Sequence, residues 1–230
     1  MSDVTPPGPA APRAVDARQA LAWAHTARFL TTASQLHQLP ASELPEIAFV
    51  GRSNAGKSTA INTLTQQRRL AFASKTPGRT QHINLFELGP KQAADAVLAD
   101  LPGYGYAAVE RSAKLRWQEV MAQYLAERPN LTGVVLLVDS RHGLTELDQQ
   151  LLRFVGERVG TGGVRLLVTL TKADKLNRGE AQRALRAAEE AVGEFVTDEA
   201  DVGLLLFSAP ERRGLDDLAL TLHGWAHPVA

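Results

Sequence analysis

The residues most capable of chemistry form a glycine-rich run in the first third of the chain. The run reads Gly51-Arg52-Ser53-Asn54-Ala55-Gly56-Lys57-Ser58 and has the spacing G-x-x-x-x-G-K-S, with Thr59 directly after it. Glycines let backbone N–H groups turn towards an anion, and a helix N-terminus behind them adds a favourable dipole. Lys57 can reach the β- and γ-phosphates of a nucleotide, and the Ser58 hydroxyl can bind Mg²⁺. The pattern predicts a phosphate-binding loop over residues 51–59.

A second motif lies about forty residues further on and reads Asp100-Leu101-Pro102-Gly103. D-x-x-G alone is expected about once per chain by chance, so the motif is weak by itself. Here it follows an apolar segment, Ala96–Ala99, at the point where a strand would end. We expect Asp100 to hold the Mg²⁺ shell through water and the Gly103 N–H to meet the γ-phosphate.

A third motif predicts which base is bound. Thr171-Lys172-Ala173-Asp174 follows the apolar segment Val164–Leu170 and fits the spacing [N/T]-K-x-D. An aspartate can accept hydrogen bonds from guanine N1–H and the 2-amino group, whereas adenine offers neither donor, so the motif favours GTP and GDP. Lys172 can stack its stem over the base. Near the end of the chain, Phe207-Ser208-Ala209 would bring backbone N–H groups to the base edge.

These motifs need a scaffold that gathers the ends of several strands. Strands are predicted at Glu46–Val50, Ile83–Leu88, Ala93–Ala99, Val134–Val138, Val164–Leu170 and Leu204–Phe207. Helices are predicted at Ser58–Thr65, Glu110–Glu127, Thr145–Val159, Gly179–Phe195 and Leu215–Trp225. Strands that alternate with helices indicate an α/β fold with a mostly parallel central sheet and helices on both faces. Ligands of such sheets bind at the carboxyl ends of the strands, where all three motifs lie.

Composition narrows the function classes. The 230 residues include no cysteine, which excludes disulfide scaffolds, cysteine-bound metal centres and thiol nucleophiles. Lys and Arg number 25 and Asp and Glu number 25, so the chain is not a general polycation. No apolar run approaches the ~20 residues of a membrane-spanning helix, and we expect a cytoplasmic monomer. Residues 1–14 hold four prolines and are predicted to be a disordered tail, residues 15–44 an N-terminal extension packing on the domain, and 45–228 the GTP-binding domain.

The order of the three motifs resembles the small P-loop GTPases and, more narrowly, the EngB family of bacterial ribosome-assembly GTPases. The narrower resemblance runs from about Arg28 to Trp225 and is carried by GRSNAGKST (51–59), SKTPGRTQHINLFEL (74–88), DLPGYGYA (100–107) and TKADKL (171–176). It implies the P-loop GTPase fold, binding of GTP and GDP with Mg²⁺, and a switch that acts on a precursor of the large ribosomal subunit.

The resemblance also implies a switch I segment. Thr80 would ligate Mg²⁺ together with Ser58 when GTP is bound, and the nucleotide would lie along Gly78, Arg79, Thr80, Gln81 and His82. Residues 101–106 would form switch II. Thr80 can reach the ion only if the γ-phosphate draws the loop in. We therefore expect residues 74–82 to be ordered beside the nucleotide only when a triphosphate is bound, and to be mobile or displaced without one.

The expected catalytic groups are Lys57, Thr80 and Gly103. Many GTPases carry glutamine directly after D-x-x-G, but here that position is Tyr104, which cannot orient water as a carboxamide does. We therefore expect slow turnover alone and stimulation by a partner. Asn54 offers a carboxamide oxygen that could ligate K⁺ beside the phosphates, or it could simply form the turn; the sequence leaves both open.

Two other functions remain open on the sequence. A P-loop metabolite kinase would leave the T-K-A-D motif unexplained. A GTPase that acts on membranes or in septation would need an amphipathic basic helix or a lipid anchor, and neither is evident in the sequence. Basic residues cluster around switch I and after switch II, where they are either solvated or contact rRNA phosphates. The clusters are Arg68, Arg69, Lys75 and Arg79, and Arg111, Lys114 and Arg116.

Overall fold

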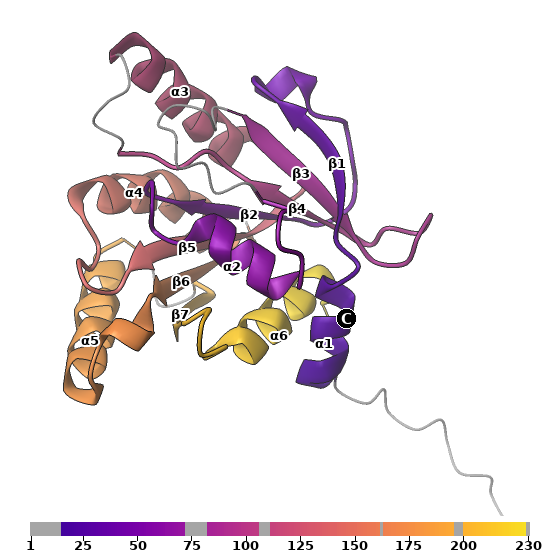
Figure 1. Ribbon diagram of the computed structural model, residues 1–230. Helices are drawn as coiled ribbons and strands as arrows, with labels where there is room; N and C mark the ends of the chain where they lie inside the picture. The colour runs from indigo at the N-terminus through magenta and orange to yellow at the C-terminus, as the bar shows by residue number, and fades with distance from the viewer. Residues whose placement is uncertain (1–14, 72–81, 106–110, 162, 196–199, 229–230) are drawn as a thin grey trace, which may run out of the picture.

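A seven-stranded sheet with helices on both faces forms the protein, and its strand order is β1-β3-β4-β2-β5-β6-β7 (Figure 1). The computed structural model describes residues 15–71, 82–105, 111–161, 163–195 and 200–228. The strands are β1 (Arg28–Ala33), β2 (Glu46–Gly51), β3 (Ile83–Leu88), β4 (Ala96–Asp100), β5 (Leu131–Asp139), β6 (Arg165–Thr171) and β7 (Val202–Leu206). The helices are α1 (Ala17–Ala24), α2 (Lys57–Leu64), α3 (Arg111–Glu127), α4 (Glu146–Thr161), α5 (Arg178–Gly193) and α6 (Leu215–Ala226).

The five strands from β4 to β7 in the sheet order are parallel, whereas β3 pairs antiparallel with both β4 and β1. The predicted fold class is therefore confirmed. β2 and β4 are buried along their whole length because helices cover both faces, which explains their nearly continuous apolar sequence. One core lies between the sheet and α3, α4 and α5, and the other between the sheet and α1, α2 and α6.

Two elements near the N-terminus had no strand or helix predicted for them. Helix α1 begins at a capping box, in which the Asp16 carboxylate accepts from the Gln19 N–H at 2.8 Å and the Gln19 side chain accepts from the Asp16 N–H. Strand β1 forms one edge of the sheet beside β3. Both elements are short, and β1 mixes exposed and buried residues, so neither leaves a clear periodic pattern in the sequence.

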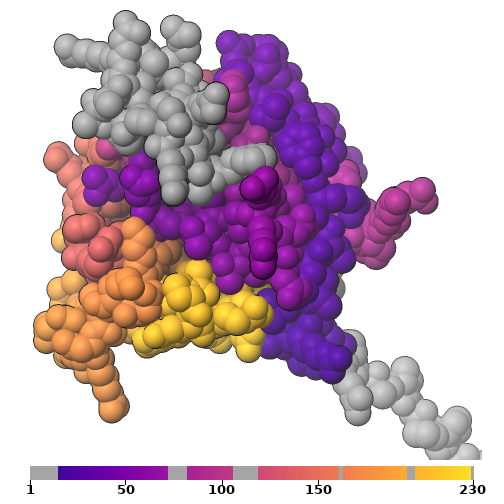
Figure 2. All heavy atoms as spheres, viewed as in Figure 1, coloured from indigo at the N-terminus to yellow at the C-terminus, as the bar shows by residue number. Residues whose placement is uncertain are grey.

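Figure 2 shows α1, in indigo, against the yellow C-terminal helix α6. Trp23 of α1 donates its indole N–H to Asp95 at 2.8 Å, and its ring meets the edges of His223 and His227. Asp95 lies just before β4. The sequence predicted this strand to start at Ala93, but a turn occupies residues 90–93 and the strand begins at Ala96. This cluster joins the N- and C-terminal helices to the sheet, on the side remote from the three motifs.

Candidate functional site

The predicted phosphate loop connects the end of β2 to the start of α2. Gly51 ends the strand so close to β5 that a Cβ there would lie 2.6 Å from the Leu137 carbonyl oxygen. Gly56 has φ +94° and stands directly before the first residue of α2, and Asn54 has φ 66°. Both values lie in the left-handed region, which glycine and asparagine adopt most readily. The backbone therefore requires the residue types that the motif places here.

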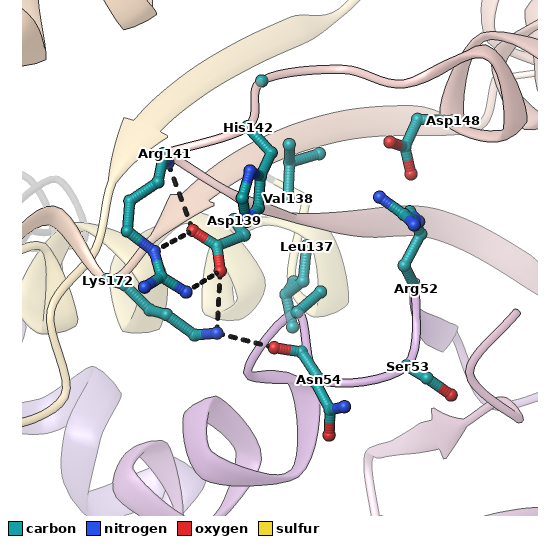
Figure 3. A pocket seen from close by; sticks show the side chains of 12 residues that line it. Arg52, Ser53, Asn54, Leu137, Val138, Asp139, Arg141, His142, Asp148 and Lys172 are labelled. Atoms are coloured by element: carbon teal, nitrogen blue, oxygen red, sulfur yellow. Dashed lines mark hydrogen bonds and ion pairs between the residues drawn. The ribbon is translucent and has the colours of Figure 1, made fainter. Parts of the chain in front are cut away.

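The T-K-A-D motif holds this loop from the end of the neighbouring strand β6. Thr171 Oγ1 donates to the Ala55 carbonyl at 2.5 Å. Lys172, at φ 58°, places its Nζ 2.8 Å from the Asn54 carbonyl oxygen and 2.8 Å from Asp139 Oδ2 (Figure 3). The base motif and the phosphate loop are thus one hydrogen-bonded unit.

Asp139, at the end of β5, is a candidate-site residue that the sequence analysis missed. Its carboxylate accepts from the Arg141 guanidinium at 2.6 and 2.9 Å in addition to Lys172. Burial alone would raise the pKa of Asp139, but the hydrogen bonds from Arg141 and Lys172 outweigh burial and hold that pKa well below its usual range. Asp139 therefore stays ionised and keeps Lys172 in place. Asp139 lies 33 residues from Lys172 in the sequence, so no local pattern pointed to this pair.

A cavity of about 400 Å³ lies between the phosphate loop and the segment after β5 (Figure 3). Its lining includes the loop residues Arg52, Ser53 and Asn54, together with Arg141 and His142. The phosphate loop and Lys172 of the T-K-A-D motif therefore border a hollow that a polar ligand could enter.

Lys57 and Asp100 come together under the loop. The Lys57 ammonium contacts Asp100 Oδ1, and both side chains are buried. Asp100 Oδ2 is also buried and has no hydrogen-bond partner among the described residues. An uncompensated carboxylate oxygen beside the phosphate loop fits a hydrated Mg²⁺, because such an ion takes oxygen ligands and keeps several waters. Ser58, the predicted direct Mg²⁺ ligand, is the second residue of α2 and follows Lys57 directly.

The D-x-x-G segment runs beside the phosphate loop. The Ser53 N–H donates to the Tyr104 carbonyl at 2.8 Å, and the Tyr104 N–H donates to the Gly51 carbonyl at 3.3 Å. A Cβ on Gly103 would lie 3.2 Å from the Ser53 nitrogen, so glycine keeps the two segments in close contact. Leu101 and Pro102 are both buried and connect the end of β4 to Gly103.

The Tyr104 side chain is buried and reaches towards α4. Its hydroxyl donates to Asp148 Oδ1 at 2.6 Å, and Asp148 Oδ2 accepts from the Thr145 N–H and hydroxyl at 2.7 and 2.6 Å. Burial, and then the Asp148 charge, raises the pKa of Tyr104 well above its usual value. The Tyr104 hydroxyl is therefore occupied as a buried donor. The sequence identified Tyr104 as an unusual residue here, but nothing in it pointed to Asp148 as the partner.

Asp174, the predicted base reader, is held by two neighbours. Ser208 Oγ donates to Asp174 Oδ1 at 2.9 Å, and Lys175 Nζ lies 3.0 Å from Oδ2. The hydrogen bond from Lys175, followed by that from Ser208, lowers the pKa of Asp174. The Ser208 N–H donates to the Arg213 carbonyl at 3.1 Å. Ser208 thus reaches this site through its hydroxyl, whereas the sequence pointed to its backbone N–H.

The remaining predicted site residues are placed as follows. The Ala173 N–H donates to the Phe207 carbonyl at 3.1 Å, which joins the T-K-A-D segment to Phe207-Ser208-Ala209. His82 Nδ1 lies 2.8 Å from Ser34 Oγ. Thr59 is in the first turn of α2. The other switch I residues, Gly78, Arg79, Thr80 and Gln81, and Tyr106 of switch II lie outside the described residues.

This sheet, with a phosphate loop after β2 and a T-K-A-D segment after β6, defines a P-loop GTPase. A family profile described as "50S ribosome-binding GTPase" matches residues 46–172. A probable GTP-binding protein EngB of Acidovorax ebreus is 63% identical over 209 residues, which cover 91% of this chain and 92% of that protein. The protein of the same name from Albidiferax ferrireducens is 61% identical and is matched over 98% of its length, and over 91% of this chain. The chain belongs to the EngB family of GTP-binding proteins.

Solved structures support the fold. The crystal structure of a probable GTP-binding protein EngB aligns with a TM-score of 0.63 and 23% identity, over 80% of this chain and 100% of that one. A structure of Era in complex with MgGDPNP and a segment of 16S ribosomal RNA aligns with a TM-score of 0.58 and 19% identity, over 80% of this chain and 57% of Era. At these identities the similarity concerns the fold alone. None of the helices in the described ranges is long and apolar enough to cross a membrane.

Proposed function

We propose that this protein is a GTP-dependent switch that acts in the cytoplasm during assembly of the large ribosomal subunit and hydrolyses GTP slowly on its own. The observation that carries the nucleotide part is the direct bonding between the ends of β2 and β6, in which Thr171 and Lys172 donate to the carbonyls of Ala55 and Asn54. The family profile, described as ribosome-binding, supports the ribosomal part.

The proposed site residues divide the work as follows. The phosphate loop and Lys57 bind the phosphates, and Ser58 with Thr80 would hold Mg²⁺, with Asp100 behind its water shell. The bound ion would neutralise charge on the phosphates. Asp174 accepts from guanine N1–H and the 2-amino group through its ionised carboxylate. Lys57, Thr80 and Gly103 would act on the transferring phosphate.

The position of Tyr104 supports slow turnover. A tyrosine whose hydroxyl donates to buried Asp148 is not available to orient an attacking water. The groups present favour binding and positioning over rapid hydrolysis, so a partner would supply or align the missing group. A metabolite kinase, by contrast, would need fast turnover without a partner and would not use a guanine-reading aspartate.

The test is co-sedimentation of the purified protein with large ribosomal subunits, with GDP or with a non-hydrolysable GTP analogue. We expect the protein to pellet with the large subunit when the triphosphate analogue is bound and to remain in the supernatant with GDP. Equal distribution in both nucleotides would contradict a GTP-dependent switch. Failure to pellet with either large or small subunits would contradict the ribosomal role itself.

A further inference from the structure

The edge of the sheet carries an exposed aromatic side chain that the nucleotide site does not use. Phe29 of β1 is 59% exposed, although phenylalanine is among the residue types that are usually buried. Its ring meets the edge of the Phe86 ring at 6.2 Å between centroids. Because Phe86 belongs to the buried core, this contact fixes the orientation of an otherwise exposed ring.

A β-bulge turns Phe29 to this side of the sheet. Phe29 pairs with Phe86 and Thr31 pairs with Leu85, so Leu30 is an extra residue in the ladder between β1 and β3. Without the bulge, Phe29 and Thr31 would lie on the same face. With it, Thr31 opposes Leu85 of the core beside α3 and α4, whereas Phe29 contacts Phe86 of the core beside α2. Bulges often redirect a functional side chain in this way.

Two arginines lie beside the exposed ring. Phe29, Gln67, Arg68, Arg69 and Leu70 line one open hollow of about 540 Å³. Arg68 and Arg69 are exposed, and within the described ranges neither forms an ion pair. The Gln67 side chain donates to the Ala27 carbonyl at 2.5 Å, which holds the segment after α2 against the start of β1. The segment that carries the two arginines is therefore held beside the strand that carries the ring.

We propose that Phe29, Arg68 and Arg69 form a stacking platform for an unpaired nucleotide of RNA. The ring stacks on the base, and the arginines contact the flanking phosphates. Charge favours RNA over an apolar protein segment. A nucleotide offers a base that can stack on the ring and negatively charged phosphates for the two arginines, whereas an apolar segment offers no negative charge. Strand addition by a second copy is disfavoured because a bulge disrupts the edge strand and two arginines lie beside it. The choice of RNA rests on the proposed ribosomal function.

The experiment measures binding of the full-length protein to a labelled single-stranded RNA of about 12 nucleotides and to the matching duplex. The Phe29→Ala variant should bind the single strand about 5- to 150-fold more weakly, which is the loss of one stacked base. Phe154→Ala is the matched control, because Phe154 of α4 is 60% exposed and should bind as the wild type does. A Phe29→Trp variant should retain binding, and its emission should change when the RNA is added.

The arginines are tested by salt dependence. In the Arg68→Gln/Arg69→Gln variant, the slope of log K against log salt should fall by about 1.4 for the single strand, because two phosphate contacts are lost. The Phe29→Ala variant should keep the wild-type slope. Equal RNA affinity of Phe29→Ala and Phe154→Ala would overturn the platform, as would unchanged emission of Phe29→Trp. Concentration-dependent dimers that Phe29→Ala abolishes would instead assign this edge to a second copy.

The same variants separate this proposal from the proposed function. If Phe29→Ala pellets with large subunits as well as the wild type and also binds the oligonucleotide equally, the platform is wrong and the ribosomal role stands. If the wild type does not pellet with subunits but its RNA binding depends on Phe29, the platform stands and the ribosomal role is wrong. Unchanged GDP affinity in every variant shows that the nucleotide domain remains folded.

Discussion

Replacing Tyr104 with phenylalanine tests whether this residue works through the core or at the phosphate. The change removes only the hydroxyl, which donates to Asp148 Oδ1 at 2.6 Å, and leaves the ring in place. Asp148 is buried, so its Oδ1 would lose the one hydrogen bond it accepts from the described residues, while its Oδ2 keeps Thr145. Leaving one buried acceptor unsatisfied costs about 1–3 kcal/mol. We expect the free energy of unfolding in urea, with GDP bound, to fall by that amount.

The rate of GTP hydrolysis should respond differently. Because the hydroxyl faces α4, Tyr104→Phe should hydrolyse GTP within about twofold of the wild-type rate in single-turnover measurements. Tyr124→Phe is the matched control, because Tyr124 also donates to a buried carboxylate, that of Glu46, at the other end of β2. A large loss of hydrolysis with unchanged stability would refute the reasoning, since it would mean that the hydroxyl acts at the phosphate.

Three further predictions concern the base, the cation and the terminal helices. Asp174→Asn should weaken GTP binding and strengthen xanthosine triphosphate binding in titrations, and unchanged GTP affinity would show that another group reads the base. Glycine tolerates the φ of 66° at position 54, so Asn54→Gly should keep the loop but abolish any excess of the hydrolysis rate in K⁺ over that in Na⁺. Equal wild-type rates in both salts would exclude a role for K⁺. Burial, followed by His227, lowers the pKa of His223, so the unfolded chain binds the proton first as pH falls. The wild type should therefore lose more stability than His223→Gln between about pH 8 and about pH 5.5 in thermal melts, and equal losses would contradict this assignment.

The sequence predicted the motifs and the strands they follow because both are local. A glycine loop after an apolar run leaves a pattern that spacing alone reveals, and β3 occupies the predicted residues 83–88. The contacts that hold the motifs together are not local. Asp148 lies 44 residues from Tyr104, and Asp139 lies 33 residues from Lys172. A single sequence carries no signal for such pairs, and these aspartates therefore looked like ordinary polar positions.

Those distant contacts suggest how the two halves of the site depend on each other. The phosphate loop is held from one side by Thr171 and Lys172, which donate to its carbonyls, and from the other by Tyr104, which exchanges backbone hydrogen bonds with Gly51 and Ser53. We therefore expect a guanine that engages the T-K-A-D segment to steady the loop proposed to bind its phosphates. Conversely, any movement of the segment after Gly103 must break or shift the Tyr104 contacts before it can leave the loop. Since Asp148 holds the Tyr104 side chain, we expect Tyr104, in the proposed switch II segment, to keep its place whichever nucleotide is bound.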